Sequence, residues 1–116
     1  MLNESAQLDL AFQALADPTR RGLLARLSRG PASVSELARP LPISLPAVLQ
    51  HLQTLEASGL VRSEKIGRVR TCRIEPKALS RAEIWIAEQR ALWEGRLDRL
   101  ETYLAELNKE EVNGRD

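Results

Sequence analysis

The chain has 116 residues, of which 43% are hydrophobic, 28% charged and only 3% aromatic. This balance fits one globular domain with an aliphatic core, and the lone cysteine, Cys72, excludes an internal disulfide. No apolar run approaches the roughly 18 residues of a membrane span, and no signal peptide is evident. We therefore expect a cytoplasmic protein without membrane contact.

The formal net charge is only +1, but the charge is unevenly distributed along the chain. Residues 1–19 have a net charge of −3, residues 20–81 of +8 and residues 82–116 of −4. A basic middle between acidic ends is typical of a polyanion-binding centre held by arms with another task. The basic segment is therefore where we look for a nucleic-acid site.

Two helices are predicted in the N-terminal part of the chain. Apolar residues at helical spacing predict a first helix over roughly residues 3–16, within a dimerisation segment that spans residues 1–16. Asp17 followed by Pro18 is typical of an N-cap with proline at the first helical position. A second helix therefore begins here, and it should end before Gly30.

Two further helices follow over residues 33–58. Ser33 and Glu36 match a capping box, which opens a short third helix. Ser44 is the expected N-cap of a fourth helix, and Gly59 is its expected C-terminal stop. The fourth helix should be buried along three apolar residues at helical spacing: Val48, Leu52 and Leu55. This pair of helices predicts a helix-turn-helix.

The helical period ends after Gly59. Two short runs rich in β-branched residues, joined by Gly67 and Arg68, predict a β-hairpin wing over residues 60–74. Cys72 shares a strand face with Ile74, so it should fill core space rather than act as a reactive thiol.

A long last helix is predicted over residues 80–107, because Ser80 and Glu83 match a second capping box. Its apolar residues form a coiled-coil-like seam: Ile86, Trp93, Leu97, Leu100, Leu104 and Leu107. With Leu8 and Phe12 of the first helix, this seam is the expected dimer interface. The alternative is that it packs only within its own chain. Residues 111–116 are expected to be a frayed tail.

The predicted fold class is mainly α with a β-hairpin wing (α+β). The elements follow the order α-α-α-α-β-β-α, which is a winged helix-turn-helix with a long C-terminal dimerisation helix. All of it should form a single domain over residues 1–110.

The outward side of the fourth helix is the expected DNA-reading surface. It carries two glutamine amides, which pair with adenine edges, and two leucines, which suit thymine methyl groups. The predicted DNA contacts of this helix are Ser44, Leu45, Pro46, Leu49, Gln50 and Gln53. The alternative is an ordinary amphipathic surface helix. His51 lies beside the buried stripe and is expected to be a partly buried structural residue.

Arginines around the hairpin are expected to contact DNA phosphates or a narrow minor groove. Arg68 lies at the turn and Arg70 just beyond it, while Arg20 could reach a flanking phosphate from the second helix. The alternative is a charged hairpin that resists edge-to-edge pairing.

Three segments together resemble one known family. They are the run Leu15–Arg21, the helix Ser44–Leu55 with His51 and Leu52, and the run Ser58–Val61. Jointly they are similar to the ArsR-type (arsenical-resistance-repressor) family of winged-helix regulators, over about residues 8–107. The resemblance implies a homodimeric bacterial transcription factor, usually a repressor released by a ligand, that dimerises through its first and last helices.

Many members of that family sense metals, so the residues at the positions of their metal ligands indicate whether this chain can bind one. The family's thiolate pair corresponds to Ser33 and Ser35 here, and the last helix contains no histidine. One cysteine and one histidine in the whole chain cannot supply three or four soft-metal ligands. The stretch Trp93–Glu101 is similar to a metal-independent branch of that family. We therefore expect no metal and no cofactor, and a small-molecule effector, if one exists, is not identified.

These observations predict a sequence-specific regulator that binds double-stranded DNA as a homodimer, most simply a repressor on a palindromic operator. The alternative is a winged-helix interaction module whose arginine-rich hairpin meets an acidic protein. An enzyme is not expected, because the chain has no catalytic Ser/His/Asp or Cys/His set and no glycine-rich phosphate loop.

Overall fold

The structure is a computed structural model that describes residues 3–113. Its helices and strands follow the predicted order, with one short strand added. In chain order the elements are α1 (Glu4–Leu15), α2 (Pro18–Leu27), β1 (Ala32–Ser33), α3 (Val34–Ala38), α4 (Leu45–Ala57), β2 (Val61–Ile66), β3 (Val69–Ile74) and α5 (Pro76–Asn113). The chain divides into two units, one ending at Ala82 and the other beginning at Glu83.

Side-chain caps fix the starts of the helices as the sequence predicts. The Asp17 carboxylate accepts the N–H of Arg20 at 3.0 Å, with proline in the first turn of α2. The Ser44 hydroxyl accepts the N–H of Ala47 at 3.3 Å and so caps α4. Each bond satisfies one backbone donor that has no partner inside its helix.

The capping box at α3 is complete, because Ser33 accepts the Glu36 N–H and Glu36 accepts the Ser33 N–H. We expect Ser33→Ala to lower the free energy of unfolding by about 1 kcal/mol, since it leaves an N-terminal donor of α3 without its partner. Urea unfolding measures the change. Ser35→Ala, at an exposed position of the same helix, serves as the control; equal stability of the two variants would contradict the role of the cap.

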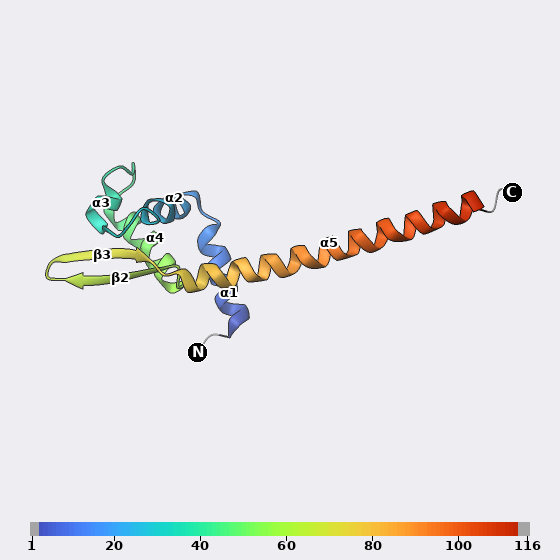
Figure 1. The fold of residues 1–116 in the computed structure, drawn as a ribbon. Helices are drawn as coiled ribbons and strands as arrows, with labels where there is room; N and C mark the ends of the chain where they lie inside the picture. Colours follow the sequence, from blue (N-terminus) through green and yellow to red (C-terminus); the bar gives the residue numbers. More distant parts are fainter. Residues whose placement is uncertain (1–2, 114–116) are drawn as a thin grey trace. The chain divides into compact units, whose positions relative to one another are not determined.

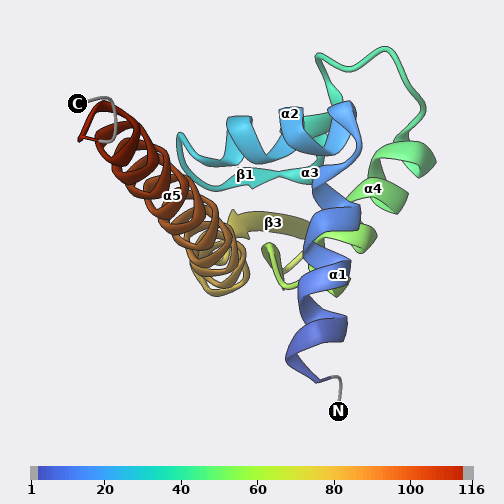
Figure 2. The same cartoon turned by 90° about the vertical axis from the view of Figure 1, so that its right-hand side faces the viewer.

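The core of the first unit lies where α1, α2 and α4 pack together and meet the sheet (Figure 2). The predicted buried stripe of α4 is confirmed: Val48, Leu52 and Leu55 are all buried. Gly59 has a φ of +79°, the left-handed conformation that favours glycine just beyond a helix. Burying one side of α4 leaves its other side free for contacts outside the domain.

The hairpin is confirmed, and its turn contains Gly67 at a φ of +63°. Strands β2 and β3 pair antiparallel, with Ile66 opposite Val69 next to the turn. Figure 1 shows this hairpin reaching away from α2, α3 and α4. A third strand, β1, pairs antiparallel with β3 and gives the order β1-β3-β2. The sequence did not predict β1, because two residues are too few to show an alternating pattern.

The predicted limits of the last helix, 80–107, are wrong at both ends. The helix α5 begins at Pro76, whose missing N–H costs nothing in a first turn, so the Ser80–Glu83 capping signal lies inside the helix. At its other end α5 continues to Asn113, so residues 111–113 of the expected frayed tail are helical. The rest of that tail, residues 114–116, lies outside the described residues.

The second unit consists of the part of α5 from Glu83 onward. All six predicted seam residues are exposed, from 43% for Leu107 to 64% for Trp93. Trp85, Leu92 and Tyr103 are also exposed and widen the apolar face. No helix within residues 3–113 is long and apolar enough to cross a membrane.

Candidate nucleic-acid interface

The outer face of α4 is exposed along its length. Leu45 at the first turn is 51% exposed and Leu49 one turn later is 36% exposed. All six predicted DNA contacts of this helix are exposed: Ser44, Leu45, Pro46, Leu49, Gln50 and Gln53. Large apolar side chains held on the surface beside amide groups match the mixture of methyl groups and polar edges in a DNA major groove.

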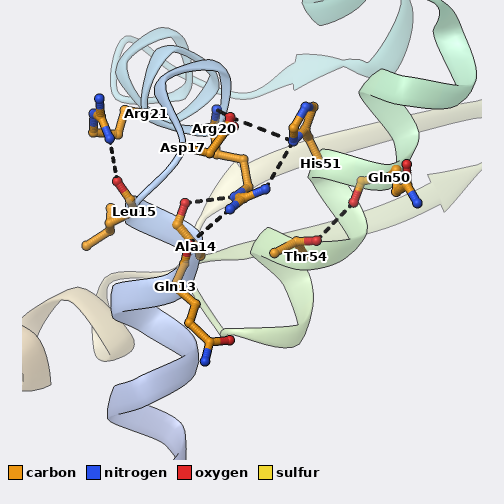
Figure 3. Close-up of polar contacts among 9 residues, drawn as sticks. All are labelled: Gln13, Ala14, Leu15, Asp17, Arg20, Arg21, Gln50, His51 and Thr54. Carbon is orange, nitrogen blue, oxygen red and sulfur yellow. Dashed lines mark hydrogen bonds and ion pairs between the residues drawn. The ribbon is translucent and has the colours of Figure 1, made fainter.

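Gln50 projects from the middle of this face. Thr54 donates from its hydroxyl to the backbone carbonyl of Gln50 at 3.2 Å, so that bond does not involve the Gln50 amide. Figure 3 shows the Gln50 side chain directed away from the polar cluster around Arg20. The Gln50 amide is therefore placed to meet a partner outside the domain.

Arg20, expected to contact a flanking phosphate, has partners inside the domain (Figure 3). Its Nε donates to the carbonyl of Ala14 at 2.8 Å, and its Nη2 donates to the carbonyl of Gln13 at 2.9 Å. Its Nη1 lies 3.2 Å from Nδ1 of His51. Three of its nitrogens thus join the end of α1 to α4. The phosphate contact stays a prediction, but the geometry favours a structural role.

His51 is half-buried, as the sequence predicts. Because arginine only donates, the contact with Arg20 requires Nδ1 of His51 to be the acceptor, which assigns the ring proton to Nε2. Asp17 lies 3.8 Å from the same nitrogen. His51 therefore fixes α4 against the loop that starts α2 rather than projecting outward.

The backbone N–H of Arg20 lowers the pKa of the Asp17 carboxyl, and the positive charge of Arg20 adds to this effect, while desolvation opposes it. A lowered pKa means that Asp17 contributes to stability above the ordinary carboxyl range. That contribution is lost as the pH falls through the lowered pKa.

The hairpin carries exposed cations in the same unit as α4. Arg68 lies in the turn, and Arg70 follows on β3. Nη1 of Arg70 donates to the hydroxyl of Ser63 at 2.9 Å, and that hydroxyl also bonds to Glu56 at the end of α4. Ser63 and Glu56 were not among the residues predicted from the sequence. Their contact with Arg70 depends on the pairing of β2 with β3, and no local sequence signal gives that register.

Cys72 is buried, with 1% of its surface exposed, and burial raises the pKa of its thiol. It fills core space, as expected. Ser33, at a position where the resemblance places a metal-binding thiolate, uses its hydroxyl to cap α3. Within residues 3–113, no three His, Cys, Asp or Glu residues gather as a metal site would require.

A helix-turn-helix with an exposed second helix and a basic hairpin defines a winged helix-turn-helix protein. A family model described as a helix-turn-helix domain matches residues 15–64. An HTH-type transcriptional regulator of Mycobacterium tuberculosis, Rv2034, is 49% identical over 72 residues, which span 62% of this chain and 67% of that protein.

Solved structures of similar proteins lead to the same class of protein. The crystal structure of an ArsR family transcriptional regulator has 55% identity and a TM-score of 0.76, covering 81% of this chain and 97% of that one. A homodimeric winged helix-turn-helix DNA-binding domain of Mycobacterium bovis has 26% identity and a TM-score of 0.59, covering 79% of this chain and 91% of that one. The chain belongs to the ArsR family of transcriptional regulators, a family of regulators rather than enzymes.

Proposed function

We propose that this protein binds double-stranded DNA as a homodimer and represses transcription from a palindromic operator. The observation that carries this proposal is the exposed outer face of α4, where glutamine amides and leucines lie in the same unit as a basic hairpin. We further propose that it acts in the cytoplasm.

The proposed recognition helix is α4, inserted with its N-terminal half in the major groove. Gln50 and Gln53 hydrogen-bond to base edges, and Leu45 and Leu49 contact thymine methyl groups. Ser44 and Pro46, at the start of the helix, lie closest to the DNA backbone. In this arrangement Arg68 reaches the neighbouring backbone or minor groove from the turn of the hairpin, and Arg70 reaches a phosphate.

The proposed dimer forms through the exposed seam of α5, together with Leu8 and Phe12 of α1. Large apolar side chains exposed along one face of a helix are the expected mark of an interaction site. The homodimeric M. bovis domain supports a second copy of this chain as the partner. A twofold dimer places two recognition helices about 34 Å apart, the repeat of one DNA turn.

We propose no specific small-molecule effector, only that the effector is not a soft metal. The thiol positions of the metal-sensing pattern hold Ser33 and Ser35, so release from DNA should not depend on a soft metal. An added zinc or arsenite salt should therefore leave operator binding unchanged.

The test compares two variants on DNA selected by this protein from a random pool and on a scrambled duplex of equal length. Gln50→Ala should weaken binding to the selected DNA by about 5- to 100-fold, with little change on the scrambled duplex, because it removes a base contact. Arg68→Ala should weaken both complexes and lower the salt slope by about 1 per protomer, because it removes a phosphate contact. Fluorescence anisotropy across a salt series measures both.

Gln13→Ala is the control for the glutamine substitution, since Gln13 is exposed on α1 and uses its backbone carbonyl rather than its amide to hold Arg20. It should bind DNA like the wild type. If Gln50→Ala and Arg68→Ala both kept wild-type affinity, the assigned surface would be wrong. If the wild type bound no duplex at all, the alternative function, binding of an acidic protein through the hairpin, would be favoured.

A further inference from the structure

We propose that Glu56 and Ser63 are positioning residues that hold the Arg70 guanidinium beside the recognition helix, where Arg70 and Lys65 together bind one DNA phosphate. This inference rests on the proposed DNA-binding function and adds to it a two-residue phosphate site and the means by which the site is held. None of Glu56, Ser63 or Lys65 belongs to the predicted set of DNA contacts.

A chain of two hydrogen bonds connects the hairpin to α4. Nη1 of Arg70 donates to Oγ of Ser63 at 2.9 Å. Because arginine has no acceptor, the Ser63 oxygen must accept, and its own proton is free to go to Oε1 of Glu56. Each bond polarises the next, so the carboxylate strengthens the grip of Ser63 on Arg70. Glu56 thus acts on Arg70 through Ser63.

The strand register explains why Arg70 lies on the side of α4. Ser63 is directly opposite Cys72, and Arg70 is two residues before Cys72, so all three share one face of the hairpin. Cys72 is buried, which shows that this face turns toward the core. Arg70, on the same face but nearer the turn, emerges where the core ends.

A pocket at this point joins the hairpin to the recognition helix. Arg70 lines it together with two predicted base contacts, Leu49 and Gln53, and with Glu56. Glu56 follows Gln53 by three residues, close to one turn of the same helix. A phosphate bound by Arg70 is therefore held in a fixed position relative to the bases that Gln53 would read.

Lys65 is a second cation beside Arg70 and supports an anion site independently of the hydrogen bonds to Ser63. It is the direct cross-strand partner of Arg70, and both side chains are exposed. Two like charges facing each other across a strand pair are unfavourable on their own. Alternation along β2 places Glu64 on the other face, so the negative charge beside Arg70 on this face is that of Glu56, which is bonded to Ser63. A phosphate between Lys65 and Arg70 would turn the repulsion into two attractive contacts.

The experiment measures binding of a scrambled duplex and of the selected DNA across a potassium chloride series. Arg70→Ala should weaken both complexes by about 10-fold and lower the salt slope by about 1 per protomer. Ser63→Ala should move affinity and slope in the same direction by a smaller amount. Ser63→Thr, which keeps the hydroxyl on a strand, should restore wild-type values. Arg73→Ala removes the same charge from the opposite face of β3 and should leave the slope nearly unchanged.

A double-mutant cycle separates positioning from general stability. If Ser63 acts through Arg70, Ser63→Ala should cause no further loss of affinity in an Arg70→Ala background. A further loss of the same size as in the wild type would overturn the inference, as would a wild-type salt slope for Ser63→Ala. The proposed function would survive either result, because it is overturned if the wild-type protein binds no duplex, and both results require that it binds one.

Discussion

Leu100→Glu in α5 should abolish the dimer at micromolar concentration and weaken binding to a palindromic operator by at least about 100-fold. Leu100 is 52% exposed in the middle of the seam, and twofold symmetry would bring both copies of the new carboxylate into one apolar interface. Burying an unpaired charge there costs several kcal/mol. A monomer then holds one half-site at a time, and the advantage of two linked sites, about 10²- to 10⁴-fold, is lost.

Ala91→Glu is the matched control, because it places the same carboxylate on α5 nine residues earlier. Nine residues are about two and a half helical turns, so Ala91 lies opposite the seam. This variant should remain dimeric and keep its operator affinity. Sedimentation velocity gives the oligomeric state of both variants, and anisotropy gives their affinity. A dimeric Leu100→Glu protein would show that the seam of α5 is not the interface.

Arg20→Ala should lower the free energy of unfolding by about 2 kcal/mol. The substitution removes three contacts that join the end of α1 to α4, and hydrogen bonds made by a charged group contribute about 1.5–3 kcal/mol. The carbonyl of Ala14, a fully buried residue, then loses its partner. Urea unfolding followed by circular dichroism measures the loss.

Arg21→Ala separates this structural role from a simple loss of charge. Arg21 is exposed and its guanidinium donates to one carbonyl, that of Leu15, so its removal should change stability by less than about 0.5 kcal/mol. Equal stability of the two variants would contradict the assigned role of Arg20. The salt slope of DNA binding, measured well below the unfolding midpoint, decides whether Arg20 also contacts phosphate: a wild-type slope means that it does not.

Local sequence signals were sufficient to predict a structural feature where a residue contacts its own segment of the chain. Asp17, Ser33 and Ser44 cap their helices because each side chain reaches a backbone N–H three residues away. Such contacts depend on the order of residues alone. The buried stripe of α4 follows in the same way from helical spacing. The helices before the hairpin and the hairpin itself could therefore be predicted.

Local signals misled at the start of α5. Ser80 and Glu83 have the spacing of a capping box, but Pro76 already begins the helix, and a chain that is helical before Ser80 has no free donors there to cap. The strand β1 was missed for the opposite reason: its two residues become a strand only because β3 pairs with them.

The sequence by itself determined the winged helix-turn-helix, its family, and which side of α4 is exposed, since caps, turns and periodicity act over a few residues. Only the tertiary structure decided which partners the arginines have within the protein. Arg20 is six residues from Ala14 but 31 from His51, and Arg70 reaches Glu56 through Ser63 on another strand. Whether an arginine bonds within the domain or stays available to DNA depends on which groups the packed elements bring within hydrogen-bond distance. Spacing along the chain does not give that distance.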